Sequence, residues 1–390
     1  MPARSHLPVR VVAPLLAGLL AMTACSGDDD VADAEDVSNE ATTTTAGEDA
    51  EPGDGEGDGD APVAEGYPPQ PEGVPFPTDE WPEGDVIDAA GLEVLEAAAE
   101  TAFTTGDDAG NGEVSSIVVV QGGEIVFEAY NPAFGPDDVF NSWSMAKTFT
   151  AALVGLTVED GLLTIADDSL REEWPADDPR NAITIEDLLH MASGLEWTEG
   201  VGYTEFFAEP DAAAWYATRE LVEEPGTRFN YSTPETAMLA REAADALGGC
   251  PEQEAFMQER LLDPIGITSE EFVRDGSGCW YGGLGMNMTT RDFARFGLLL
   301  LRGGLWDGEQ LLPTDWVDAM REPSPALDAY GYQTWLVDGG EAFAARGFQG
   351  QTILVVPDDD VVIAVNNLDG TDCPLISAAL DELGSDVAAC

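Results

Sequence analysis

Lysine is nearly absent from this chain of 390 residues: Lys147 is the only one, beside 14 arginines. Histidine is almost as scarce, with His6 and His190 alone. So few histidines leave little material for a zinc site. A histidine-based hydrolytic triad would have to use His190, without the Gly-x-Ser-x-Gly sequence that accompanies one. Since no phosphate-binding loop of the Walker type is present either, we expect neither a metal nor a cofactor.

Positive charge is scarce as well. Lysine and arginine together number 15 against 76 acidic residues, and the formal net charge is −61. Much of this excess lies beyond the N-terminal segment, so the folded part must itself have an acidic surface. Such a surface repels nucleic acid and anionic membranes, and we expect neither as a partner. Two origins of this acidic surface are consistent with the sequence: adaptation to a saline environment, and an amino-acid composition typical of the lineage.

A hydrophobic run long enough to span a membrane comfortably is missing. The apolar stretch from Val11 to Met22 follows Arg4 and Arg10 and ends at Thr23-Ala24-Cys25, which is the order of an export signal. Its small-residue end before a cysteine resembles a bacterial lipoprotein signal. Residues 1–25 are therefore expected to be a signal peptide with Cys25 lipidated, which would anchor the protein to the outer side of the cell membrane. The alternative is an ordinary secretory signal and a secreted protein.

Large apolar residues are few from residue 26 to about 80, where Asp, Glu, Gly, Thr, Ala and Pro dominate. Such a composition cannot bury enough surface to offset the entropy of ordering. We expect residues 26–80 to be a disordered acidic linker, with order beginning near Asp85 and one folded domain over residues 85–390.

Four cysteines remain after Cys25: Cys250, Cys279, Cys373 and Cys390. An even number in an exported chain predicts two disulfides. All three pairings are open, and local spacing favours Cys250 with Cys279 and Cys373 with Cys390.

The hydrophobic pattern places strands at both ends of the folded part and helices between them. A hairpin is expected over residues 115–130, with its turn at Gly122-Gly123, after a helix over 91–104. The expected later strands cover 332–337, 342–345, 352–356 and 361–366, before a last helix over 375–383. The expected helices between cover 145–159, 184–192, 236–247, 252–262 and 290–302. This order predicts an α+β fold, with one antiparallel sheet from both chain ends, flanking helices and an inserted, mostly helical lobe.

Lys147 follows Ser144 by three residues, at the start of an expected helix. That spacing brings the amine beside the hydroxyl on one helix face. Serine is a weak nucleophile until a base removes its proton, and a buried amine can serve as that base. Arginine cannot deprotonate near neutral pH, which explains why this position would need the single lysine. We therefore predict Ser144 as a nucleophile and Lys147 as its proton acceptor.

Three motifs occur in order along the chain: Ser144-Met145-Ala146-Lys147, residues 183–195, and residues 225–232. Together they resemble the β-lactamase-related serine hydrolases, a family that includes class C β-lactamases, penicillin-binding DD-peptidases, family VIII esterases and 6-aminohexanoate-dimer hydrolases. The resemblance runs from about Asp85 to Asn367 and implies the β-lactamase/transpeptidase-like fold. Residues 282–297 and 303–316 resemble the esterase and 6-aminohexanoate-hydrolase branch most.

By this resemblance Tyr231 is the third catalytic group, whose phenol relays protons. The family's Tyr-x-Asn here reads Tyr231-Ser232-Thr233, with Thr233 expected at the substrate. Its Lys-Thr-Gly aligns best with Ala345-Arg346-Gly347, so the charge at the first position is missing.

Gly347 keeps the close backbone approach of that motif. The next backbone N–H, on Phe348, is expected to form an oxyanion hole with that of Ser144. Arg346 is a weaker candidate for replacing the missing lysine, because neighbouring strand residues face opposite sides. Tyr203 and Gln349 are further candidates for substrate contact.

The resemblance implies acylation of Ser144 by a small-molecule ester or linear amide, followed by hydrolysis. The two departures from the family's motifs favour this over β-lactam turnover. A DD-peptidase, a penicillin-binding protein or a β-lactamase is the first alternative, and a non-catalytic binding module on the same fold is the second.

Overall fold

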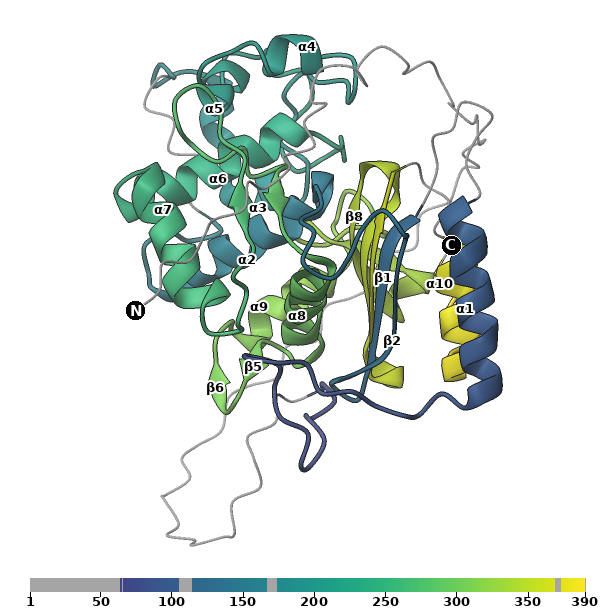
Figure 1. Cartoon of the computed structure of the whole chain (residues 1–390). Coiled ribbons are helices and arrows are strands. Elements are labelled where there is room, and N and C mark those ends of the chain that lie inside the picture. The colour runs from purple at the N-terminus through teal and green to yellow at the C-terminus, as the bar shows by residue number, and fades with distance from the viewer. Residues whose placement is uncertain (1–63, 65, 105–113, 167–173, 369–372, 390) are drawn as a thin grey trace, which may run out of the picture. The chain divides into compact units, whose positions relative to one another are not determined.

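A six-stranded antiparallel sheet forms the centre of the molecule (Figure 1). The computed structural model describes residues 64, 66–104, 114–166, 174–368 and 373–389. The signal segment, Cys25 and most of the expected linker lie outside these residues. In spatial order the strands are β2 (Glu124–Tyr130), β1 (Val114–Gln121), β10 (Val361–Asn367), β9 (Gln351–Val356), β8 (Ala342–Gly347) and β7 (Trp335–Val337). The sheet is built from both chain ends, which confirms the predicted fold class.

Helices cover both faces of this sheet. Side chains of β1 alternate between two cores: Ile117 and Val119 join the core under α1 (Ala89–Thr104) and α10 (Cys373–Leu383), and Val118 and Val120 join the other. On that second face α8 (Thr290–Leu301) packs against β1, β9 and β10. Figure 1 shows α8 on the left of the sheet and α1 with α10 on the right.

A mostly helical lobe lies between β2 and β7 in the chain. Its helices are α2 (Ala146–Glu159), α3 (Ile185–Leu189), α4 (Tyr203–Phe206), α5 (Ala212–Tyr216), α6 (Thr233–Leu247) and α7 (Cys250–Met257). The same segment of the chain also contains helix α9 (Thr314–Arg321) and two short ribbons. One ribbon pairs β3 (Glu271–Phe272) with β4 (Met286–Asn287), and the other pairs β5 (Leu305–Trp306) with β6 (Glu309–Gln310). The side chains of α2 are almost all buried, so α2 is the central helix.

Three helices differ from the prediction by three or more residues at one end. The helix expected from 184 to 192 ends as α3 at Leu189, and Met191 adopts a left-handed φ of 57°. The helix expected from residue 236 begins at Thr233, because the Ser232 hydroxyl accepts from the Glu235 N–H at 3.2 Å and caps it. The helix expected over 252–262 is α7 followed by a π-helical turn over Gln258–Leu262.

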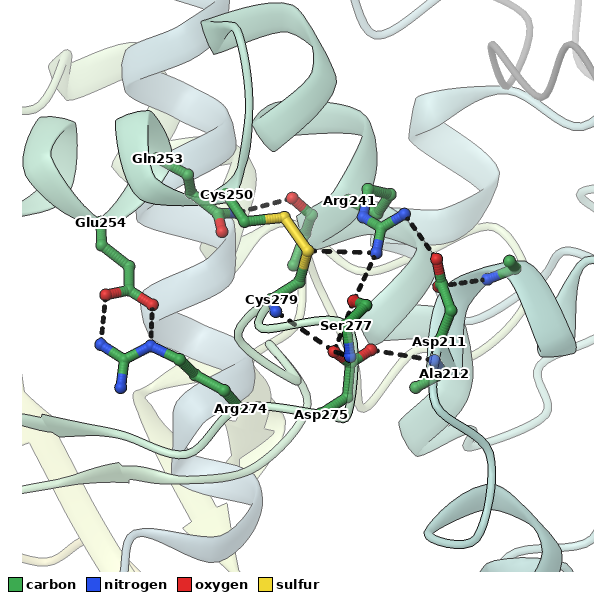
Figure 2. The surroundings of a disulfide bond; sticks show 12 residues. Asp211, Ala212, Arg241, Cys250, Gln253, Glu254, Arg274, Asp275, Ser277 and Cys279 are labelled. Atoms are coloured by element: carbon green, nitrogen blue, oxygen red, sulfur yellow. Dashed lines mark hydrogen bonds and ion pairs between the residues drawn. A yellow bond between two sulfur atoms is a disulfide. The ribbon is translucent and has the colours of Figure 1, made fainter.

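A disulfide joins Cys250, the first residue of α7, to Cys279 (Figure 2). Close by, Arg241 of α6 pairs with Asp211 at 3.0 Å and donates to the Ser277 hydroxyl at 3.2 Å. The pairing favoured by local spacing is therefore confirmed for these two cysteines. The bond expected between Cys373 and Cys390 involves Cys390, which lies outside the described residues.

Ordered packing begins earlier than the expected start near Asp85. The buried Tyr67 donates from its hydroxyl to Asp318 at 2.7 Å, Gln70 accepts from Arg302 at 3.0 Å, and Thr78 accepts from the Trp306 indole at 2.8 Å. The prediction of a linker to residue 80 is therefore wrong for this last stretch. Its isolated aromatic residues bind to distant elements, which local hydrophobic periodicity cannot show.

Within the described part of the chain, no helix combines the length and the apolar character needed to cross a membrane.

Candidate active site

Ser144 lies in a single 3-10 turn, Trp143–Met145, that leads directly into α2. The preceding Ser142 is buried, and its hydroxyl accepts from the Met286 N–H at 2.9 Å. Trp143 has a φ of 44°, which is costly for a residue with a bulky side chain. Such strain persists only where the surroundings hold the backbone in place, and it clusters at functional sites. The loop therefore presents Ser144 in a fixed position at the start of the central helix.

Lys147 lies one helical turn after Ser144 and is fully buried. Its Nζ lies 3.1 Å from the Ser144 Oγ, 2.9 Å from the Thr233 Oγ1 and 2.8 Å from the Gly283 carbonyl oxygen. Burial lowers the pKa of Lys147 to about 8, while the nearby Glu199 carboxylate acts in the opposite direction. A large fraction of this amine is therefore neutral just above neutral pH, as a base must be.

Tyr231 stands two residues before α6, and its ring centre is 4.9 Å from the Lys147 Nζ. Burial raises the pKa of its phenol, and hydrogen bonding with Ser144 opposes that rise. The ring stacks on Trp335 of β7 with centroids 5.6 Å apart, which fixes its orientation. The structure thus brings Ser144, Lys147 and Tyr231 together from two distant stretches of chain.

The end of β8 lies against the loop that carries Ser144. A Cβ atom on Gly347 would be 2.5 Å from the Ser142 carbonyl oxygen, so only glycine fits at this distance. The Phe348 ring, half exposed, meets the Trp143 ring edge to face at 5.6 Å. Phe348 directly follows the Gly347 contact, and the role of its backbone N–H in an oxyanion hole stays a prediction.

The neighbours of Gly347 have different surroundings. Gln349 accepts from the Trp143 indole N–H at 3.2 Å, so its side chain lies beside the nucleophile loop. Gln351 is buried and pairs with Asn367 inside the sheet. Arg346 donates to the Ala389 carbonyl at 2.7 Å, beside a small cavity under α10. The structure therefore gives no support to Arg346 as a replacement for the missing lysine.

Thr233 and Tyr203, both expected to contact substrate, bond to Glu199, a residue that the motifs do not reveal. The Thr233 hydroxyl lies 2.6 Å from the Glu199 carboxylate and 3.1 Å from the Tyr203 hydroxyl. Tyr203 also donates to Glu199. Glu199 is one of 76 acidic residues in the chain, and nothing in the sequence around it marks it as different.

His190 packs its ring against Tyr332 at 4.8 Å, and burial lowers its pKa. Among the described residues no cluster of three or more His, Cys, Asp or Glu side chains is arranged to hold a metal ion. The groups gathered around Ser144 are a buried amine and a phenol. Such a set can activate a hydroxyl for attack on a carbonyl carbon and return the proton to a leaving group.

Residues 99–371 match the protein family described as Beta-lactamase. The 6-aminohexanoate-dimer hydrolase of Paenarthrobacter ureafaciens is 23% identical over 283 residues, which are 64% of this chain and 71% of that protein. The lovastatin esterase of Penicillium rubens is 31% identical over 170 residues, which cover 35% of this chain and 40% of the esterase.

Among solved structures, a family VIII carboxylesterase superposes with a TM-score of 0.60 at 16% identity, over 76% of this chain and 98% of that one. At this identity the superposition shows a shared fold.

Proposed function

We propose that this chain, which belongs to the beta-lactamase family and is a serine hydrolase of that family, cleaves a carboxylic ester or a linear amide. The reaction would proceed through an acyl-enzyme on Ser144. The observation that carries the proposal is the 3.1 Å contact between the Ser144 hydroxyl and the buried Lys147 amine, whose pKa is lowered to about 8. A base of this kind can take the serine proton as the hydroxyl attacks the substrate carbonyl.

Tyr231 is proposed to carry the proton onward. Because burial raises the pKa of the phenol, Tyr231 is protonated at neutral pH and can donate to the departing alcohol or amine. Lys147 then restores the phenol proton. The backbone N–H groups of Ser144 and Phe348 are proposed to hold the negative oxygen of the tetrahedral intermediate. Water, activated by the same groups, releases the acyl product.

The walls around Ser144 favour an uncharged substrate. Aromatic rings stand on two sides: Trp143 with Phe348, and Tyr231 with Trp335. Ala345 stands where the family's motif has a lysine, and Arg346 turns to the Ala389 carbonyl. Without that cation, the carboxylate of a penicillin or of a cell-wall peptide would lose a partner that the motif normally supplies. Apolar acyl or alcohol groups fit the aromatic walls better.

The proposal is tested with purified protein and three substrate classes: p-nitrophenyl esters of short acids, the 6-aminohexanoate dimer, and a chromogenic cephalosporin. We expect turnover of the esters or the linear amide that is abolished in the Ser144→Ala variant. Rapid cephalosporin hydrolysis without esterase or amidase activity would overturn the substrate class. Stable acylation by labelled penicillin, without turnover of any of the three, would favour a penicillin-binding protein.

We also propose that the protein acts outside the cytoplasm, held at the membrane by a lipid on Cys25. The support is the sequence of residues 1–25 alone. When the full chain is produced in a bacterial host, the wild type should sediment with membranes and the Cys25→Ser variant should not. Equal distribution of the two proteins would contradict the anchor.

A further inference from the structure

The Glu199 carboxylate lies behind the proposed catalytic base and is surrounded by hydrogen-bond donors. It accepts from the Trp197 indole, the Tyr203 hydroxyl, the Thr233 hydroxyl at 2.6 Å and the Thr233 N–H at 3.1 Å. The last of these donors is in the first turn of α6, where the helix dipole favours negative charge. The Glu199 carboxylate is therefore surrounded by four hydrogen-bond donors. Its oxygens are occupied, which leaves little capacity to bind a substrate.

Few hydrogen-bond acceptors are available for the proton of the Thr233 hydroxyl. The Thr233 hydroxyl has one proton, and its neighbours are Glu199, the Tyr203 hydroxyl and the Lys147 amine. Glu199 accepts only, and Tyr203 has its own proton directed at Glu199. The Thr233 proton therefore goes to Glu199 or to Tyr203, and the Thr233 oxygen faces Lys147 as an acceptor.

A neutral amine has two protons and one lone pair. Lys147 has three polar neighbours: the Gly283 carbonyl, the Thr233 hydroxyl and the Ser144 hydroxyl, at 2.8, 2.9 and 3.1 Å. The carbonyl can only accept, and Glu199 makes the Thr233 oxygen accept as well. Both amine protons are then committed, and the lone pair points at the third neighbour, Ser144.

We infer that Glu199 is a positioning residue: by holding the Thr233 hydroxyl as an acceptor, it directs the lone pair of neutral Lys147 at the Ser144 proton. This inference rests on the proposed function, because it assigns the geometry of the same base. Glu199 touches no reacting atom and acts through Thr233. Its charge has a second effect, since it holds the pKa of Lys147 higher than burial alone would.

The Glu199→Gln variant separates these effects from simple packing. A glutamine amide presents both a donor and an acceptor. Its carbonyl must face the two N–H donors, Trp197 and Thr233, so its NH₂ faces the Thr233 hydroxyl and donates to it. The Thr233 proton is then free to bond to the Lys147 lone pair, which turns the base away from Ser144. Loss of the negative charge also lowers the pKa of Lys147.

The experiment measures the second-order rate constant for phosphonylation of Ser144 by a fluorophosphonate, in which the serine oxygen attacks phosphorus and fluoride leaves, between pH 5 and 10. This reagent does not depend on knowing the natural substrate. In the wild type the rate should rise to a plateau with an apparent pKa of about 8. In Glu199→Gln we expect the rising limb to move to lower pH and the plateau to fall about tenfold or more. Thr233→Val should also lower the plateau, and Thr233→Ser, which keeps the hydroxyl, should restore it.

A matched control is available on α6. Glu235 is a buried carboxyl group that accepts from Ser193, and burial raises its pKa to about 8. The charge that acts on the pKa of Lys147 is that of Glu199. Glu235→Gln should leave the limb where it is in the wild type. The limb position does not depend on how much enzyme is folded, so partial unfolding of a variant does not obscure it.

A Glu199→Gln plateau equal to that of the wild type would overturn the positioning role, and a limb that coincides with the wild-type limb would overturn the effect of the Glu199 charge on Lys147. Failure of the fluorophosphonate to modify Ser144 of the wild type would instead overturn the proposed function.

Discussion

The Gly283 carbonyl accepts from the Lys147 amine at 2.8 Å while Gly283 itself lies pressed against α6: a Cβ atom on it would be 2.6 Å from the Thr233 carbonyl oxygen. The contact joins three stretches of chain at one point, namely the start of α2, the start of α6 and the segment after the disulfide. The amine is thus held by backbone that only glycine allows to come so close.

Gly283→Ala should therefore damage both the site and the fold. The added methyl group forces the two backbones apart, and we expect a loss of about 1–3 kcal/mol in the free energy of unfolding together with a large loss of activity. Gly135→Ala is the matched control, because a Cβ there would meet no atom nearer than 4.0 Å. Urea unfolding and esterase assays on both variants test this. Equal behaviour of the two would contradict the close approach.

The pH dependence of kcat/KM should follow the protonation of Lys147. The neutral amine is the active form, and burial lowers its pKa to about 8. The rate should consequently rise about tenfold per pH unit at low pH and level off above about pH 8. A profile on a neutral ester, measured with overlapping buffers, checks this. A rate that is flat from pH 6 to 9 would exclude Lys147 as the base.

Replacing Lys147 by arginine should abolish turnover even though the charge remains, since a guanidinium does not deprotonate in this range. We expect a fall of about a thousandfold in kcat/KM. Lys147→Met, which removes the buried amine, should be as inactive and should keep its melting temperature. Thermal unfolding of both variants separates loss of chemistry from loss of fold. Substantial activity in either one would contradict the assignment.

Tyr231→Phe removes the proton relay and keeps the ring stacked on Trp335. A p-nitrophenolate leaves without a proton, whereas an alkyl alcohol needs one. We therefore expect a fall of about a hundredfold in kcat for an alkyl ester and a smaller fall for its p-nitrophenyl analogue. Tyr330→Phe, at a buried tyrosine that packs against the same rings, should change neither. Equal losses on both esters would argue against donation to the leaving group.

Much of the fold follows from local sequence pattern. The β-branched run along β1 and the paired glycines after it predict the hairpin, and the apolar runs near the C-terminus predict β9 and β10. The pair Ser144 and Lys147 could be predicted from local sequence as well, because the two residues are three positions apart and Lys147 is the only lysine. Tyr231 needed the family resemblance, since its separation from Ser144 carries no local signal.

Glu199 and the segment from Tyr67 to Thr78 could not be predicted, for a shared physical reason. Glu199 is defined by its contact with Thr233, 34 residues later, and Tyr67 by its bond to Asp318, 251 residues later. A chain rich in acidic residues gives no indication of which carboxylate is surrounded by donors. Only the folded arrangement distinguishes it.

Intact-mass measurement after fluorophosphonate treatment shows whether Ser144 is the nucleophile. We expect one adduct per chain on the wild type, located on the peptide that contains Ser144, and no adduct on Ser144→Ala. An unmodified wild type, or an adduct that persists in Ser144→Ala, would show that Ser144 is not the nucleophile.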